Sequence, residues 1–95
     1  MRALGEVRAA RDLDQDTLAR SRRVLGEDHP DTLLSASNFA LDLRALGEVR
    51  AARDLNQDTL DRARRVLGED HPDTRRYASN LAEDLRLLGE AGDGS

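Results

Sequence analysis

The chain has 95 residues, about the size of one small domain, and 38% of them are hydrophobic. Charged residues make up 36% and the net charge is −4, which argues against a general nucleic-acid binder. Cysteine is absent, so disulfides and zinc–thiolate sites are excluded, and no apolar run approaches the ~18 residues of a membrane span. The first residues lack the apolar segment of a signal peptide, and we expect a cytoplasmic protein.

An internal repeat organises the chain. Residues 2–43 align with residues 44–85 at an offset of 42 residues, and the copies differ only at positions 14, 19, 21, 33, 34, 35, 39 and 41. A fixed period of this length is typical of repeat arrays. The sequence therefore predicts an all-α fold, a solenoid of antiparallel helix hairpins with four helices, over residues 1–90. The Gly-rich polar residues 91–95 are expected to be a disordered tail.

The four helices can be placed in chain order. The first is predicted over residues 6–25, where apolar and small residues recur every three or four positions. The second runs over residues 30–46 and begins with Pro30, which suits a first helical position. The third, over residues 48–67, repeats the first, and the fourth, over residues 72–88, repeats the second. Gly26 ends the first helix, and Gly5, Gly47 and Gly89, each after a leucine, are expected to close helices in the left-handed conformation. Residues 1–4 then read as the end of a preceding helix.

The two ends of the array differ in character. Three apolar positions of the second helix become charged in the fourth, where Leu33, Leu34 and Leu41 are replaced by Arg75, Arg76 and Glu83. A terminal unit of a solenoid needs a hydrated outer face, so the fourth helix is predicted to be a cap. The first helix has no antiparallel partner before it. We expect either a segment of a longer array or self-association through this open edge, which carries Val7, Leu13 and Leu18.

These features resemble the tetratricopeptide repeat, in which paired helices pack through small residues. The 42-residue period with its Gly-Glu-Asp-His-Pro-Asp-Thr link is similar to the long repeat of kinesin light chains and of many actinobacterial regulators. The resemblance covers residues 2–90. It implies a non-catalytic module that binds a protein or an extended peptide, as the C-terminal part of a larger bacterial regulatory protein.

The resemblance also implies a binding surface, because the family binds peptides on its concave face. Carried over position by position, that face consists of Leu34, Ser37, Asn38, Leu41, Arg44, Arg76, Ser79, Asn80, Glu83 and Arg86. The two asparagines match a position that holds a peptide backbone or carboxylate, since an amide can donate and accept at once. The two last-turn arginines can add charge-assisted bonds to a carboxylate. The alternative for the asparagines is a bond to a neighbouring helix that sets its register.

Other site chemistries have weaker support. His29 and His71 each lie among aspartates, which can hold a divalent ion, but each copy offers a single histidine and the loop is explained as a helix connection. The helix carboxylates alternate with arginines, and no nucleophile or Gly-rich phosphate loop accompanies them. The arginine clusters at 20–23 and 62–65 lack interleaved aromatics for base stacking. We predict no metal, no cofactor, no nucleic acid, no membrane and no enzyme.

Two functional hypotheses follow. The first is protein or peptide binding on the concave face. The second is structural: self-association, as a homodimer or a domain-swapped assembly, in which the first helix buries Val7, Leu13 and Leu18 against a second chain.

Overall fold

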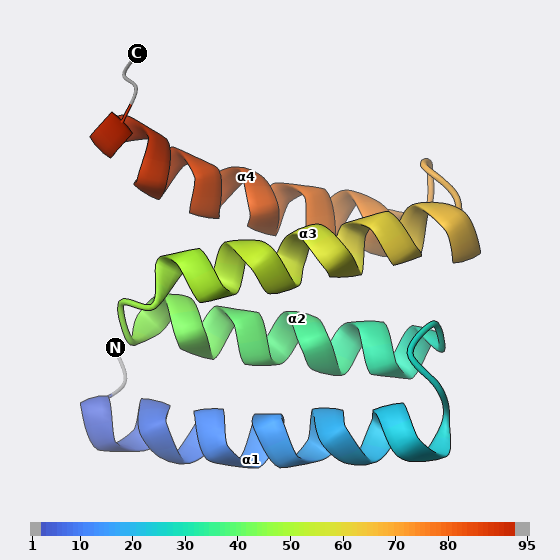
Figure 1. Ribbon diagram of the computed structural model, residues 1–95, viewed down its shortest axis with the longest axis horizontal. Coiled ribbons are helices and arrows are strands. Elements are labelled where there is room, and N and C mark those ends of the chain that lie inside the picture. Colours follow the sequence, from blue (N-terminus) through green and yellow to red (C-terminus); the bar gives the residue numbers. More distant parts are fainter. Residues whose placement is uncertain (1–2, 93–95) are drawn as a thin grey trace.

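The computed structural model describes residues 3–92, with side chains described as far as residue 89, and consists of four helices joined by short turns (Figure 1). Helix α1 spans Leu4–Val24, α2 spans Pro30–Ala45, α3 spans Val49–Val66 and α4 spans Pro72–Gly92. No strand occurs between residues 3 and 92. The predicted all-α solenoid of four antiparallel helices is confirmed.

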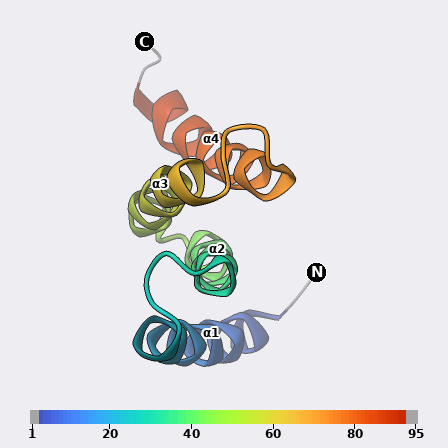
Figure 2. The same ribbon diagram turned by 90° about the vertical axis from the view of Figure 1, so that its right-hand side faces the viewer.

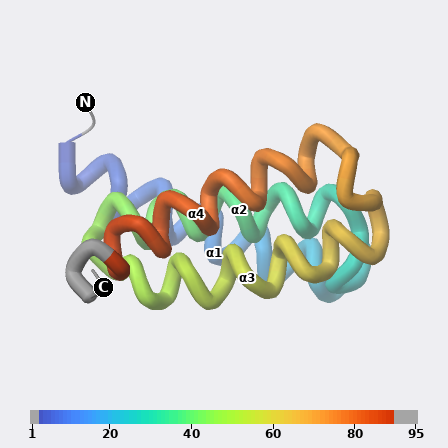
Figure 3. Tube along the Cα trace, turned by 90° about the horizontal axis from the view of Figure 1, so that it is seen from above, coloured from blue at the N-terminus to red at the C-terminus, as the bar shows by residue number. Residues whose placement is uncertain are grey.

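The helices form two layers. Each helix packs on the next one along the chain, and α2 also contacts α4. Viewed end-on, α1 and α3 lie in one layer, while α2 and α4 lie in the other (Figure 2). From above, α2 and α4 run along one side of the stack, with α3 along the other (Figure 3). The outer helices α1 and α4 therefore lie at opposite ends of the stack, and each leaves one surface uncovered by the described residues.

The turn between α2 and α3 shows why a helix ends at Gly47. Its φ of 89° lies in the left-handed region, which costs glycine little. The next residue, Glu48, donates its backbone N–H to the Leu43 carbonyl at 2.8 Å, which satisfies a helix-end acceptor. Gly26 and Gly68 have φ values of 98° and 94° at the ends of α1 and α3. These positions reverse the chain so that consecutive helices lie antiparallel.

The predictions for Gly5 and Gly89 were wrong. Leu4 begins α1 and Gly5 lies inside it, while α4 continues through Gly89 to Gly92, past the predicted end at Leu88. Neither glycine has a positive φ. A reversal at Gly47 is stabilised by packing of α3 on α2, and no described helix lies beyond Gly5 or Gly89 to stabilise another. Of the predicted tail 91–95, residues 91–92 belong to α4, and residues 93–95 lie outside the described part.

The two histidines cap helices. The imidazole Nδ1 of His29 accepts the backbone N–H of Asp31 at 3.0 Å, and His71 accepts that of Asp73 at 3.0 Å. Each histidine therefore satisfies one of the unpaired donors at a helix start, just before the proline in the first helical position. Within residues 3–92, no group of three or more His, Asp or Glu side chains is placed to hold a metal ion.

The core lies mainly between α2, α3 and α4. One cluster contains Leu33, Leu60, Ala63, Tyr77 and Leu81, and another contains Ala40, Leu43 and Ala52. Both therefore depend on α2 lying against the second copy of the repeat. On α4, Arg75 and Arg76 are exposed as predicted for an outer face.

Candidate functional site

A buried carboxylate joins the three helices α2, α3 and α4. Asp84 on α4 is fully buried, and its Oδ1 accepts a hydrogen bond from Arg44 Nε at 2.7 Å. Its Oδ2 accepts from Asn56 Nδ2 on α3 at 2.6 Å. Arg44 also donates from Nη2 to the Asn80 carbonyl at 2.7 Å. Both oxygens of the Asp84 carboxyl group are therefore bonded, and one of the partners is the charged Arg44.

The asparagine of the second copy takes part in the same contact. Asn80 Nδ2 donates to Ser37 Oγ on α2 at 3.1 Å. We call Ser37, Arg44, Asn56, Asn80 and Asp84 the inter-unit polar cluster. Three of its members, Ser37, Arg44 and Asn80, were predicted to bind a peptide, but each makes contacts that hold α2 on α4. The register alternative for Asn80 therefore has direct geometric support.

Sequence reasoning missed Asp84 and Asn56. A signal for the first was present, because Tyr77, Leu81, Asp84 and Leu88 lie at helical spacing on one face. An aspartate within an apolar stripe indicates a buried ion pair, and the same aspartate occurs as Asp42 in the first copy. No comparable signal marks Asn56, because its counterpart is Asp14.

The remaining predicted residues lie on the face shared by α2 and α4. Leu34 and Leu41 are 41% and 40% exposed. Asn38, Ser79 and Arg86 are also exposed. We call the following set the α2/α4 face: Leu34, Asn38, Leu41, Arg76, Ser79, Glu83 and Arg86. It combines apolar side chains on one helix with charged side chains on the other.

Two of the arginines on this face pair with neighbours on α4. Arg76 contacts Asp73 at 2.8 Å, and Arg86 bonds to Glu83. The hydrogen bond from Arg86 holds the pKa of the Glu83 carboxyl below its usual value. Both arginines remain exposed, so an acidic ligand can approach them.

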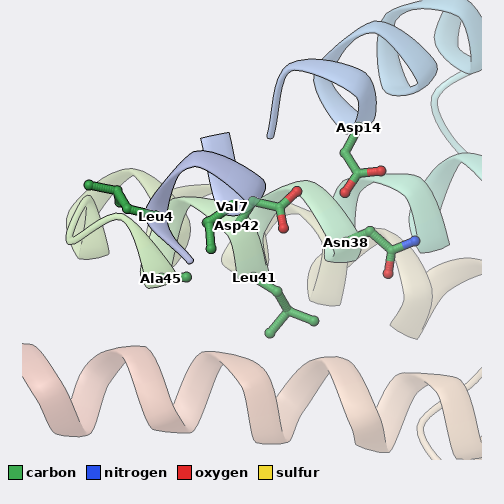
Figure 4. A pocket seen from close by; sticks show the side chains of 7 residues that line it. All are labelled: Leu4, Val7, Asp14, Asn38, Leu41, Asp42 and Ala45. Atoms are coloured by element: carbon green, nitrogen blue, oxygen red, sulfur yellow. The ribbon is translucent and has the colours of Figure 1, made fainter. Parts of the chain in front are cut away.

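A groove lies between α1 and α2 at the uncovered end of the stack. It is lined by Leu4, Val7, Asp14, Asn38, Leu41, Asp42 and Ala45. Asp14 and Asn38 lie toward one end of this α1–α2 groove and Leu4 and Ala45 toward the other (Figure 4). The groove therefore presents two carboxylates among mostly small or apolar side chains.

The residues predicted for self-association are not equally accessible. Val7 and Leu18 are only 9% and 3% exposed, whereas Leu13 is 66% exposed. Two of the three thus contribute to packing inside the chain. Of the three residues predicted for self-association, only Leu13 is therefore accessible to a second chain.

The arginine clusters of α1 and α3 are paired with acids. Arg20 contacts Asp16 at 2.6 Å, and Arg22 contacts Glu27 at 3.1 Å. Arg62 donates to Asp28 at 2.8 Å and to Asp58 at 2.9 Å, and these two hydrogen bonds raise its pKa above the usual value. The Asp28 contact crosses from α3 to the loop before α2, so it also helps to position the second copy on the first.

The chain matches a known protein family. The sequence profile of the tetratricopeptide repeat matches residues 1–31 and 32–73. The second segment covers most of α2 and all of α3, so the profile pairs these two helices in one unit, whereas the offset alignment pairs α1 with α2 and α3 with α4. A search of curated proteins found no match. Among residues 3–92, no helix is long and apolar enough to cross a membrane.

Proposed function

Because the chain belongs to the tetratricopeptide repeat family, whose members bind other proteins, we propose that it is a non-catalytic module that binds an extended peptide on the α2/α4 face. The peptide belongs to a partner protein, and the module serves within a larger regulatory protein. The surface is short, with one helix from each copy of the repeat. Binding in the micromolar range is therefore the expectation for this chain alone.

The observation that supports this proposal is the exposure of Leu34 and Leu41 on α2 together with that of Arg76 and Arg86 on α4, two helices that contact each other. The two leucines are seven positions apart, so they lie on the same side of α2, about 10 Å apart along its axis. Exposed leucines offer apolar contact, and arginines offer paired hydrogen bonds to carboxylates. A peptide that carries apolar and acidic residues fits this combination best.

Asn38 is the residue best placed to bind a peptide backbone. Its side chain is exposed, whereas the equivalent Asn80 donates to Ser37. An amide side chain can pair with both the N–H and the C=O of an extended strand. The asparagine role implied by the family is accordingly assigned to the first copy alone.

The test is a peptide array probed with the 95-residue chain, followed by fluorescence polarisation of the strongest binders. We expect Leu34→Asp to weaken binding at least about tenfold, because it removes apolar contact and repels acidic peptides. Asn38→Ala should weaken it about fivefold. Val66→Asp is the matched control, since Val66 is an exposed apolar residue on α3, outside this face. Binders that respond to none of the changes, or equally to all three, would contradict the proposal.

Self-association remains the second candidate function, and one observation favours it. Leu13 is a large apolar side chain that is 66% exposed. It lies on α1, the helix at one end of the stack. The symmetric version through α1 alone has little apolar surface, because Val7 and Leu18 are buried in the chain.

A further inference from the structure

The α1–α2 groove corresponds, one repeat earlier in the sequence, to the surface of α3 and α4 on which α2 packs. Each of its residues Val7, Asp14, Asn38 and Asp42 lies 42 positions before a residue at the contact of α2 with α3 and α4. Those later residues are Val49, Asn56, Asn80 and Asp84. The molecule thus contains an occupied example of the same surface, one repeat further along the chain.

Burial confirms that the two surfaces differ in what covers them. Asn56, Thr59 and Ala63 on α3 are fully buried, whereas Asp14, Thr17 and Ser21 on α1 are only half-buried. Leu55 packs against the core cluster around Leu43, but its counterpart Leu13 is exposed. What buries the residues of α3 is α2, and no described helix takes that place over α1.

Helix α4 carries the same docking surface as α2. The five α2 residues at the contact are repeated without change in α4, as Ala78, Ser79, Ala82, Leu85 and Arg86. On α2 the four uncharged ones are buried, but on α4 Ser79, Ala82 and Leu85 are exposed, with Leu85 at 47%. Within the described residues, the stack therefore presents at its α4 end an uncovered copy of the surface that α2 packs on α3.

We propose that a second copy of this chain docks its α4 on α1 and α2, head to tail, as α2 docks on α3 and α4 within one chain. The two surfaces lie at opposite ends of the stack, as Figure 1 shows, so the contact does not close on itself. Self-association by this route extends the solenoid. It uses the α1–α2 groove and goes beyond the peptide binding proposed above.

The occupied copy predicts the polar contacts. The incoming helix carries Arg86 at the position of Arg44, which bonds to Asp84 at 2.7 Å. The Arg86 guanidinium, which bonds to Glu83 within its own chain, would thus also approach Asp42 of the next chain. Asn38 donates to Ser79 of the incoming helix, as Asn80 donates to Ser37. In the loop before α4, Asp70 is almost fully exposed, and it is placed to pair with Arg20 as Asp28 pairs with Arg62.

The differences between the copies fall on both sides of this contact. In the groove, Asp14 replaces Asn56 and adds a second carboxylate where Arg86 arrives. On α4, Arg75 replaces the buried Leu33, which packs against Tyr77 and Ala63. In the first copy, Ser35 on α2 and Ser21 on α1 stand at the positions of that tyrosine and that alanine.

Two consequences follow from these replacements. The larger arginine meets smaller side chains with hydroxyl groups, so the contact can still form but is weaker than the one within the chain. The groove carries two aspartates, whereas α4 carries Arg75, Arg76 and Arg86, each of which contacts an acid of its own chain. Two copies of the groove facing each other would place aspartates against aspartates, and this repulsion disfavours a symmetric arrangement relative to the head-to-tail one.

The experiment measures molar mass by light scattering across a concentration series of the 95-residue chain, in low salt. We expect the mass to rise steadily with concentration, without a plateau at the dimer. Leu13→Arg blocks the receiving surface and Leu85→Arg blocks the donating helix. Both leucines are exposed, so the chain should fold, which circular dichroism checks. Each variant alone should associate at least tenfold more weakly, and Val66→Arg on α3 should associate as the original chain does.

Mixing the two blocked variants distinguishes the arrangements. The Leu13→Arg chain keeps its α4, and the Leu85→Arg chain keeps its groove, so an equimolar mixture should form a dimer of defined mass that grows no further. A symmetric contact through α1 predicts instead that Leu85→Arg associates normally and that the mixture gains nothing. That result overturns the proposal, as does a chain that stays monomeric at millimolar concentration.

Discussion

At the scale of single residues, the interior is held in register by a charge. Asp84 accepts one hydrogen bond from Arg44 on α2 and one from Asn56 on α3. Apolar side chains such as leucine and alanine pack with little directional preference, whereas this carboxylate is bonded at both oxygens. Its geometry specifies how far α2 lies along α3 and α4.

Removal of this carboxylate should destabilise the fold. We expect Asp84→Ala to lower the free energy of unfolding by about 3 kcal/mol, because it leaves a half-buried guanidinium and a buried amide without their partner. Urea unfolding followed by circular dichroism measures the change. Asp16→Ala, which breaks an exposed ion pair with Arg20, should cost less than about 0.5 kcal/mol. Equal losses in the two variants would contradict the structural role assigned to Asp84.

The alkaline pH dependence of stability should come from Tyr77. Burial, and then the charge of Asp73, raise the pKa of its hydroxyl above the ordinary value of about 10. In the unfolded chain the tyrosine loses its proton first, so the free energy of unfolding falls as pH rises from about 10 toward the folded-state pKa. Lysine and cysteine are absent and arginine keeps its proton, so no other side chain titrates there.

The check is urea unfolding of the original chain and of Tyr77→Phe between pH 8 and 11. The variant should show a much flatter dependence above pH 10. Absorbance of the single tyrosinate, titrated in the folded chain, reports the raised pKa directly. If the free energy of unfolding of Tyr77→Phe falls with pH as steeply as that of the original chain, another group causes the pH dependence.

At the scale of elements, identical local sequence gives different structure. The pentapeptide Ala-Leu-Gly-Glu-Val occurs at residues 3–7 and at residues 45–49. The first lies at the start of α1, with Gly5 helical, and the second forms the turn between α2 and α3. Since the residues are the same, packing of the flanking helices decides which conformation forms.

One substitution at two glycines should have opposite effects. Gly47 has a φ of 89°, where alanine is strained, so Gly47→Ala should lower the free energy of unfolding by about 1–2 kcal/mol. Gly89 lies within α4, where an added methyl group would meet open space, so Gly89→Ala should raise it by up to about 1 kcal/mol. Thermal unfolding of both variants tests the assignment, and a loss on Gly89→Ala would contradict its helical conformation.

The same comparison explains what could be predicted from the sequence. The 42-residue offset and the Pro30 and Pro72 positions predicted four helices and their order, because these signals are local or periodic. Where α1 begins and where α4 ends depends on whether another helix packs beyond them. The local sequence does not reveal this. For Asn80 the sequence left peptide binding and a register bond to a neighbouring helix as alternatives, since the partner Ser37 lies 43 positions away and only the fold brings them together.

At the scale of the whole molecule, burial is uneven. Helices α2 and α3 each pack between two neighbours, whereas α1 and α4 each have one surface uncovered by the described residues. In a solenoid, stability is the sum of units and of contacts between adjacent units. The inner helices therefore take part in more of the stabilising contacts than the outer ones.

Hydrogen exchange should follow this order. In dilute solution, backbone amides in the middle of α2 and α3 should exchange at least about tenfold more slowly than those of α1 and α4, because the outer helices can open alone. Mass spectrometry of peptic fragments measures the rates. At high concentration, protection of α1 and α4 should rise toward that of the inner helices if chains dock end to end. Uniform protection in dilute solution would indicate a single cooperative unit instead.

The pairing of Arg44 with Asp84 also bears on how such a protein changes over evolutionary time. The two residues lie 40 positions apart within one 42-residue copy, so every added period brings its own arginine and its own aspartate. Unequal recombination between tandem gene segments that inserts or deletes a whole period therefore preserves each buried pair. A change that alters the spacing between this arginine and this aspartate leaves the aspartate in the interior without its cation, so insertions and deletions of whole periods disturb the interior least.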